Sequence, residues 1–228
     1  MQGKDIDMKK GKDIDMKINK KNMLLYAITD RQWLNGRTLV SQVEEVLKNG
    51  ATFLQLREKN LPYNELIREA LEIKEIADRY NVPFVINDNI YAARETGADG
   101  VHIGQGDASY KKARELLGDG KIIGMTAHNL EEALAAQEAG ADYIGTGAVF
   151  ATSTKNDTTP MTLSTLKEIT DNITIPIVAI GGINHKNIVK LKGSGIDGVA
   201  VISALFAQEN AGSATARMLN LCREVING

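Results

Sequence analysis

The feature that most constrains the fold is a short glycine-containing phrase, which recurs where a helical pattern gives way to an apolar, strand-like run. It occurs at 49–51 (Asn-Gly-Ala), 96–100 (Thr-Gly-Ala-Asp-Gly), 139–142 (Ala-Gly-Ala-Asp) and 194–198 (Ser-Gly-Ile-Asp-Gly). Glycine is common just past the end of a helix, because it adopts a positive φ without a steric penalty. Repetition of the same corner favours successive strand-helix units over an open sheet with scattered insertions.

Eight β-rich runs alternate with stretches of helical period from residue 23 onward. One such stretch places Leu66, Ala70 and Ile73 on a single apolar face, and Asn129 and Ser213 are placed to cap later helices. The expected strands cover 24–29, 52–56, 84–87, 100–103, 121–126, 143–150, 177–180 and 198–202. Because 228 residues suffice for one barrel and little more, the sequence predicts an α/β protein with a single (β/α)8 (TIM) barrel.

Residues 1–22 differ from the rest of the chain, since the charged heptapeptide Gly-Lys-Asp-Ile-Asp-Met-Lys occurs twice, at 3–9 and 11–17. The repeat has too few apolar side chains to build a core. We therefore expect a disordered tail at 1–22 and a catalytic barrel domain at 23–228. A solvated tail is favoured over a functional arm.

The overall charge and the cysteine content exclude several classes of partner. A net charge of −2 gives no basic surface for nucleic acid, and no run approaches the ~20 apolar residues that span a bilayer. The only cysteine, Cys222, lies in a helical pattern and is expected to pack as a small apolar group. These features predict a cytoplasmic protein with neither a nucleic-acid nor a membrane partner.

Polar and glycine clusters follow the expected strands. They lie at 55–59 (Gln-Leu-Arg-Glu-Lys), 87–88, 104–107, 126–128, 152–155, 181–182 and 202–203. Because the carboxyl ends of parallel barrel strands meet at one rim, these clusters are expected to form a single site.

Two aspartates in these clusters are candidate metal ligands. Asp88 and Asp107 end neighbouring strands, and Mg²⁺ is commonly held by one or two carboxylates together with water and phosphate oxygens. Alternatively, Asp88 caps the helix that begins near Asn89, and Asp107 closes a glycine-rich turn. Residues 57–59 could likewise be a solvated charge run. The cations and the amide expected at the same rim favour a metal-diphosphate site: Arg57, Lys59, Asn87 and Lys155.

A second anion site is indicated by the loops after the seventh and eighth strands, which commonly bind phosphate in such barrels. Gly182 and Ser203 lie in these loops, although a Gly-Gly pair also occurs in ordinary tight turns. His102 lies within a strand and is more typical of a packed core residue than of a catalyst, and the role of His128 stays open. Three hydroxyls after the sixth strand could serve either anion: Thr152, Ser153 and Thr154.

Taken in order, these motifs resemble the thiamine-phosphate synthase family over essentially all of residues 23–228. Members of that family have a (β/α)8 fold and join hydroxymethylpyrimidine diphosphate to hydroxyethylthiazole phosphate, releasing diphosphate. The resemblance implies a pyrimidine diphosphate site formed by Gln55, Leu56, Arg57, Glu58, Lys59, Asn87, Thr126 and Lys155. It implies a thiazole phosphate site formed by Thr152, Ser153, Thr154, Gly182, Ile202 and Ser203.

The resemblance also implies a Mg²⁺-assisted, dissociative substitution. Asp88 and Asp107 would hold Mg²⁺, and the thiazole nitrogen would attack a benzyl-like pyrimidine cation after the diphosphate leaves. Such a scheme needs no strong protein base. The residues implied to assist catalysis are Arg57, Lys59, Lys155 and Thr126, the last of which replaces a serine usual in the family.

Two alternatives remain at this point. A thiazole tautomerase-like paralogue would need a histidine just before Val149, where this chain has Ala148. A non-catalytic thiazole-phosphate-binding protein would not need diphosphate and metal groups. Ala148 and Ala151 also replace prolines frequent in the family, which bears on rates more than on identity. A homo-oligomer is compatible with the sequence.

Overall fold

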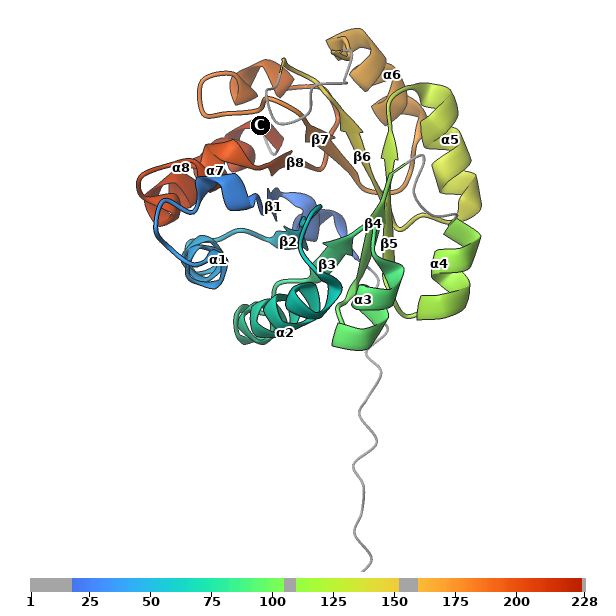
Figure 1. Ribbon diagram of the computed structural model, residues 1–228. Coiled ribbons are helices and arrows are strands. Elements are labelled where there is room, and N and C mark those ends of the chain that lie inside the picture. The colour runs from blue at the N-terminus through green and yellow to red at the C-terminus, as the bar shows by residue number, and fades with distance from the viewer. Residues whose placement is uncertain (1–17, 105–109, 152–159, 227–228) are drawn as a thin grey trace, which may run out of the picture.

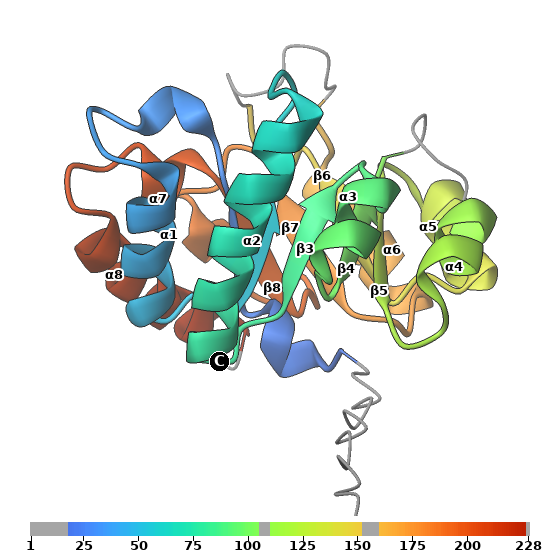
Figure 2. The same ribbon diagram turned by 60° about the horizontal axis from the view of Figure 1, so that its bottom comes forward.

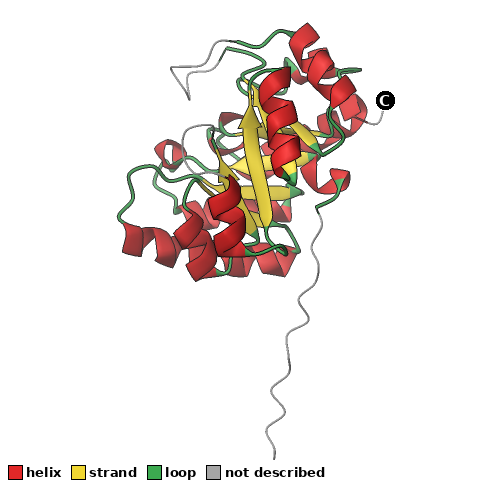
Figure 3. Ribbon diagram, turned by 90° about the vertical axis from the view of Figure 1, so that its right-hand side faces the viewer, coloured by secondary structure: helices red, strands yellow, loops and turns green. Residues whose placement is uncertain are grey.

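Eight parallel strands form a closed barrel in which each strand pairs with the next along the chain and β8 pairs with β1. The computed structural model describes residues 18–104, 110–151 and 160–226. Helices surround the strands on the outside (Figures 1 and 3). The predicted (β/α)8 barrel is therefore confirmed.

The strands have nearly the predicted bounds. They are β1 (Leu25–Ile28), β2 (Phe53–Leu56), β3 (Phe84–Asn87), β4 (Gly100–Ile103), β5 (Ile122–Ala127), β6 (Tyr143–Gly147), β7 (Ile177–Ile180) and β8 (Gly198–Val201). Strand β6 differs most, because it ends at Gly147 rather than at residue 150. The apolar run continues past the strand because Val149 is buried in the loop that follows.

The barrel is covered by α-helices that range from 4 to 18 residues in length. They are α1 (Leu39–Lys48), α2 (Tyr63–Tyr80), α3 (Ile90–Thr96), α4 (Tyr110–Leu117), α5 (Leu130–Ala139), α6 (Leu163–Asn172), α7 (Ser203–Phe206) and α8 (Ala211–Ile226). The short 3₁₀ helices are η1 (Lys20–Met23), η2 (Arg31–Trp33) and η3 (Ile188–Leu191). Asn129 caps α5 as predicted, whereas α8 is preceded by Asn210, whose side chain accepts the Ser213 N–H at 2.7 Å. The expected cap at Ser213 was therefore wrong by one helical turn.

The recurring corner phrase joins a helix end to the following strand at four places, before β2, β4, β6 and β8. The first glycine of each phrase has a positive φ, and in three of the four corners an aspartate carboxylate accepts a backbone N–H from the start of the preceding strand. The distances are 2.8 Å for Asp99 to Phe84, 2.8 Å for Asp142 to Ile123 and 2.9 Å for Asp197 to Ile177. These bonds satisfy N–H groups at the amino ends of the strands, which explains why aspartate recurs in the phrase.

The apolar core has two parts, one inside the barrel and one between the barrel and its helices. The interior part contains Tyr26, Phe53 and Tyr143, whose rings meet edge to face with centroids 4.6 to 5.8 Å apart. Cys222 belongs to the outer part and is fully buried, and burial raises the pKa of its thiol to about 12. Cys222 therefore packs as an apolar group, as predicted.

The amino end of the barrel is closed by η1, which lies beneath the strands in Figure 2. Met23 is fully buried, and the ammonium group of Lys20 lies 2.9 Å from Asp197. Residues 20–22 therefore form part of the barrel, so the structured chain begins before the expected boundary at residue 23. The remaining part of the expected tail, 1–17, lies outside the described residues. None of the described helices is long and apolar enough to cross a membrane.

Candidate active site

A cavity of about 150 Å³ opens at the carboxyl ends of the strands. It receives side chains from neighbouring strands because every second residue of a barrel strand points inward. The lining residues are Tyr26, Ile28, Gln55, Arg57, Lys59, Asn87, Asp88, His102, Gly104, Thr126, Gly145, Val178, Ile180, Ala200 and Ile202. Seven of the predicted site residues thus converge on one space: Gln55, Arg57, Lys59, Asn87, Asp88, Thr126 and Ile202.

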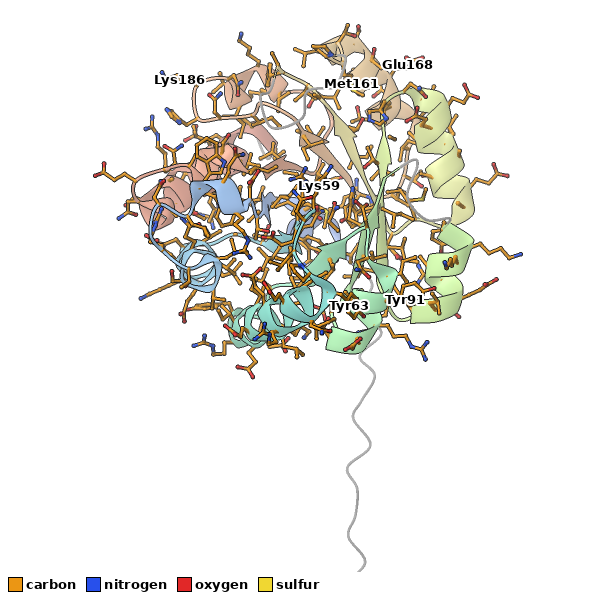
Figure 4. All side chains as sticks on the ribbon, in the orientation of Figure 1. Lys59, Tyr63, Tyr91, Met161, Glu168 and Lys186 are labelled. Carbon is orange, nitrogen blue, oxygen red and sulfur yellow. The ribbon has the colours of Figure 1, made fainter. Side chains whose placement is uncertain are left out.

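Two cations reach the cavity from the turn after β2. The Arg57 N–H donates to the Thr29 hydroxyl at 2.9 Å, which fixes the start of that turn. The Arg57 guanidinium lies 4.0 Å from Asp30, and Lys59 has no ion-pair partner among the residues whose structure is described. Lys59 lies near the middle of the ring of strands in Figure 4. This pair of cations is suited to a phosphorylated ligand.

Two other members of the predicted pyrimidine diphosphate group have side chains that point elsewhere. Leu56 is fully buried in the outer core. Glu58 lies 3.3 Å from Arg31, which also binds Glu69 at 2.6 Å, and burial raises the pKa of the Glu58 carboxyl. Neither side chain lines the cavity. Glu58 supports the turn after β2 through its ion pair with Arg31, whereas Arg57 and Lys59 line the cavity.

Asp88 does not act as the cap of the following helix. The side chain of Asn89 caps α3 by accepting the Ala92 N–H at 2.9 Å. Asp88 instead has a φ of 62°, an uncommon conformation for a residue other than glycine, and its N–H donates to the His102 carbonyl at 2.8 Å. Asn87 donates its side-chain amide to the Asp88 carboxylate. The helix-cap alternative is therefore excluded.

The donor set at Asp88 fits a hard divalent cation. Its carboxylate lines the cavity beside Asn87, and Mg²⁺ needs only one or two protein carboxylates when phosphate oxygens supply other ligands. No cluster of three His, Cys, Asp or Glu side chains occurs within 18–104, 110–151 and 160–226. The second predicted ligand, Asp107, lies outside the described residues.

The region predicted to bind the thiazole phosphate is only partly described. Ile202 lines the cavity, whereas the side chain of Ser203, at the start of α7, and Gly182 do not. A Cβ on Gly182 would lie 2.3 Å from the Ala151 carbonyl oxygen, so the chain after β6 requires glycine there. The remaining predicted residues of this site, Thr152, Ser153 and Thr154, lie outside the described ranges, as does Lys155, which was predicted to bind the pyrimidine diphosphate.

His102 and His128 have different environments. His128 is exposed at the start of α5, where its ring and its N–H each lie 2.8 Å from a Glu132 oxygen. His102 points into the barrel, where it contacts Tyr143 at 2.9 Å and Thr126 at 3.1 Å. Tyr143 in turn lies 2.7 Å from Tyr26.

These two tyrosines were not predicted as site residues. The signal for them is the alternation of side chains along each strand, since Tyr143 lies two residues before the lining residue Gly145, and Tyr26 two before Ile28.

A closed (β/α)8 barrel with cations, an amide and a carboxylate around one cavity at its carboxyl end is typical of a barrel enzyme whose cavity is suited to an anionic ligand. The family model described as thiamine monophosphate synthase matches residues 25–205. The chain therefore belongs to the thiamine-phosphate synthase family, whose members are transferases.

Individual relatives agree with this assignment over nearly their whole length. The chain is 48% identical to the thiamine-phosphate synthase of Clostridium novyi, over 88% of this chain and 98% of that protein. It is 44% identical to the thiamine-phosphate synthase of Clostridium tetani, over 91% and 100% of the two chains. Among solved structures, thiamine phosphate pyrophosphorylase from Pyrococcus furiosus is 37% identical with a TM-score of 0.84, covering 91% of this chain and 98% of that one.

Proposed function

We propose that the protein condenses hydroxymethylpyrimidine diphosphate with hydroxyethylthiazole phosphate, forming thiamine phosphate and releasing diphosphate. Family membership over residues 25–205 supports the reaction class. The observation that carries the proposal is the meeting of Arg57, Lys59 and Asp88 in one cavity at the barrel mouth. Together these groups suit a diphosphate that is bound with a metal ion.

The two cations would act on the leaving group. In the proposed reaction the bond between the pyrimidine methylene carbon and a diphosphate oxygen breaks, and its electron pair leaves with the diphosphate. Arg57 and Lys59 would stabilise the charge that develops there, because they are already held in place before the bond breaks. The thiazole nitrogen then forms the new bond to the methylene carbon. Lys155 and Thr126 are proposed to bind the same diphosphate.

Asp88 would hold Mg²⁺, with Asp107 as the second proposed ligand. When bound, Mg²⁺ would supply positive charge to the diphosphate oxygens. Asn87 would orient the Asp88 carboxylate by the hydrogen bond that it donates to it. Gln55, on the neighbouring strand β2, lines the same cavity, where it would contact the pyrimidine ring.

The thiazole phosphate would bind at the other side of the mouth. Thr152, Ser153, Thr154, Gly182, Ile202 and Ser203 are proposed for this part of the site. Ile202 supports the placement because it lines the same cavity as the cations. The tautomerase alternative gains no support, since Ala148 has no acid-base group and the relatives carry the name of the synthase.

We also propose that the enzyme acts in the cytoplasm on these small molecules, with neither nucleic acid nor membrane as a partner. The net charge of −2 and the single buried thiol support this. Self-association into a homo-oligomer is compatible with it.

The decisive experiment measures diphosphate release by the purified protein with both substrates and Mg²⁺, omitting each component in turn, and identifies thiamine phosphate by mass. We expect product only when all three are present. Diphosphate release that persists without the thiazole substrate, or no product from folded protein, would overturn the proposal.

A further inference from the structure

A chain of five side chains crosses the barrel interior and links two residues of the proposed pyrimidine diphosphate site. Gln55 Nε2 lies 2.6 Å from the Tyr26 hydroxyl, which lies 2.7 Å from the Tyr143 hydroxyl. The Tyr143 hydroxyl lies 2.9 Å from His102 Nδ1, and His102 Nε2 lies 3.1 Å from Thr126 Oγ1. Every step has the length of a hydrogen bond, so Gln55 and Thr126 are connected without a gap.

Hydrogen counting gives this chain a direction. The Gln55 amide nitrogen can only donate, so the Tyr26 oxygen accepts from it and the single Tyr26 hydrogen goes to Tyr143. Tyr143, having accepted from Tyr26, gives its own hydrogen to Nδ1 of His102. Nδ1 then has no hydrogen of its own. The imidazole therefore holds its hydrogen on Nε2, which donates to Thr126.

The burial of Tyr26 and Tyr143 supports this assignment of hydrogen-bond directions. Tyr26 is 1% exposed and Tyr143 is 0% exposed, so each hydroxyl must find its partners inside the barrel. Burial raises the pKa of both phenols, so both hydroxyls keep their hydrogen at neutral pH.

Two glycines provide the space for the chain. A Cβ on Gly124 would lie 2.1 Å from Cζ of Tyr143, and a Cβ on Gly145 would lie 3.4 Å from Cε1 of His102. Because Gly124 and Gly145 have no side chains, the rings of Tyr143 and His102 fit against strands β5 and β6. The barrel interior is shaped for this arrangement as well as for packing.

We propose that Tyr26, Tyr143 and His102 are positioning residues that fix the hydrogen-bond polarity at both ends of the chain. At one end, Gln55 keeps its amide oxygen for a donor in the cavity, such as the amino group of an aminopyrimidine. At the other, Thr126 directs its hydroxyl hydrogen away from His102 and towards an acceptor such as a diphosphate oxygen. The inference rests on the proposed function, because it assigns these ends to the two parts of the pyrimidine substrate.

The first test reads the tautomer of His102 and needs no activity. The chain has three histidines, and His128 and His185 lie outside the cavity. In protein labelled with ¹⁵N-histidine, a His128→Gln/His185→Gln variant leaves the His102 ring as the only signal. We expect the His102 ring to be the neutral Nε2–H tautomer at neutral pH. When Tyr143→Phe is added to this variant, we expect His102 to lose its preference for the Nε2–H tautomer. An Nδ1–H tautomer or an imidazolium would overturn the proposal even if the enzyme is active.

The second test asks whether Tyr143 acts through Thr126. We expect Tyr143→Phe to lower kcat/KM by about tenfold in the parent protein and by less than about twofold in a Thr126→Ala background. Tyr63→Phe is the matched control, because Tyr63 is an exposed tyrosine hydrogen-bonded to Glu95, away from Lys59 in Figure 4. An equal fall in kcat/KM in both backgrounds, with unchanged near-ultraviolet circular dichroism, would contradict the proposal that Tyr143 acts through Thr126. Absence of product in the parent protein would sink the proposed function but leave the tautomer result intact.

Discussion

At the scale of single residues, the direction of a side chain decides its role more than its type does. Arg57 and Lys59 face the cavity, whereas Glu58 between them faces Arg31. The sequence predicted the run but not this alternation within a turn, because no strand period applies there. It likewise missed Tyr26 and Tyr143, since a tyrosine in an apolar run is more typical of the core. Spacing alone did not separate a helix cap from a metal ligand at Asp88, and the neighbouring cations favoured the ligand.

Replacing Asp88 tests its proposed metal role. We expect Asp88→Asn to raise the Mg²⁺ concentration for half-maximal turnover by about tenfold or more, because an amide is a weaker ligand for Mg²⁺ than a carboxylate. Turnover at a series of Mg²⁺ concentrations measures this. Asn89→Ala serves as the control, since it removes the cap of α3 but no carboxylate. An identical Mg²⁺ curve for Asp88→Asn would contradict the role.

The support behind the Arg57 turn can be tested by stability. Arg31→Ala leaves the Glu58 side chain, only 7% exposed, without its cation, so we expect the free energy of unfolding to fall by about 1–2 kcal/mol. Adding Glu58→Gln should restore part of that loss, because no buried charge remains. Arg79→Ala, which breaks an exposed pair with Glu44, should cost less than about 0.5 kcal/mol. Urea unfolding compares the variants, and equal effects of Arg31→Ala and Arg79→Ala would refute the buried role.

At the scale of elements, the β-rich runs and corner glycines predicted all eight strands. The ends of the strands were harder to predict, because an apolar run indicates that residues are buried and not that they pair with a neighbouring strand. Val149 is buried beyond the end of β6, which made that strand too long in the prediction. The covering element after β7 is the short η3, where a full helix was expected. Both differences arise from tertiary contacts that a local pattern does not contain.

Gly124 in strand β5 and Gly120 in the turn before it form a pair of glycines for a packing test. A Cβ on Gly124 would lie 2.1 Å from the Tyr143 ring, whereas a Cβ on Gly120 meets nothing within 4 Å. Gly124→Ala should therefore destabilise the protein by about 1–3 kcal/mol, since a packed interior cannot absorb the methyl group. Gly120→Ala should be close to neutral. Thermal unfolding followed by circular dichroism compares them, and similar melting temperatures would show that the Tyr143 ring can move.

At the scale of the whole molecule, the barrel is closed differently at its two ends. The carboxyl end holds the polar cavity, and the amino end is sealed by η1 and the buried Met23. The repeat at 3–9 and 11–17 led to the expectation of a tail reaching residue 22. That boundary came from composition, which does not register the ion pair between Lys20 and Asp197. The residues of the candidate active site and the residues that seal the barrel thus lie at opposite ends of the same strands.

This division predicts that the amino-end seal can be weakened without altering the cavity. Met23→Ala removes a fully buried side chain, so we expect the free energy of unfolding to fall by about 2–4 kcal/mol. Lys20→Ala should cost less than about 1 kcal/mol, because the Lys20 side chain is 64% exposed. Since the cavity lies at the other end of the barrel, KM for both substrates should change less than about twofold in either variant at a temperature where both are folded. Urea unfolding and steady-state kinetics on the same preparations measure the two effects. A large rise in KM for Met23→Ala would show that the amino-end seal and the active site are coupled through the interior aromatic cluster.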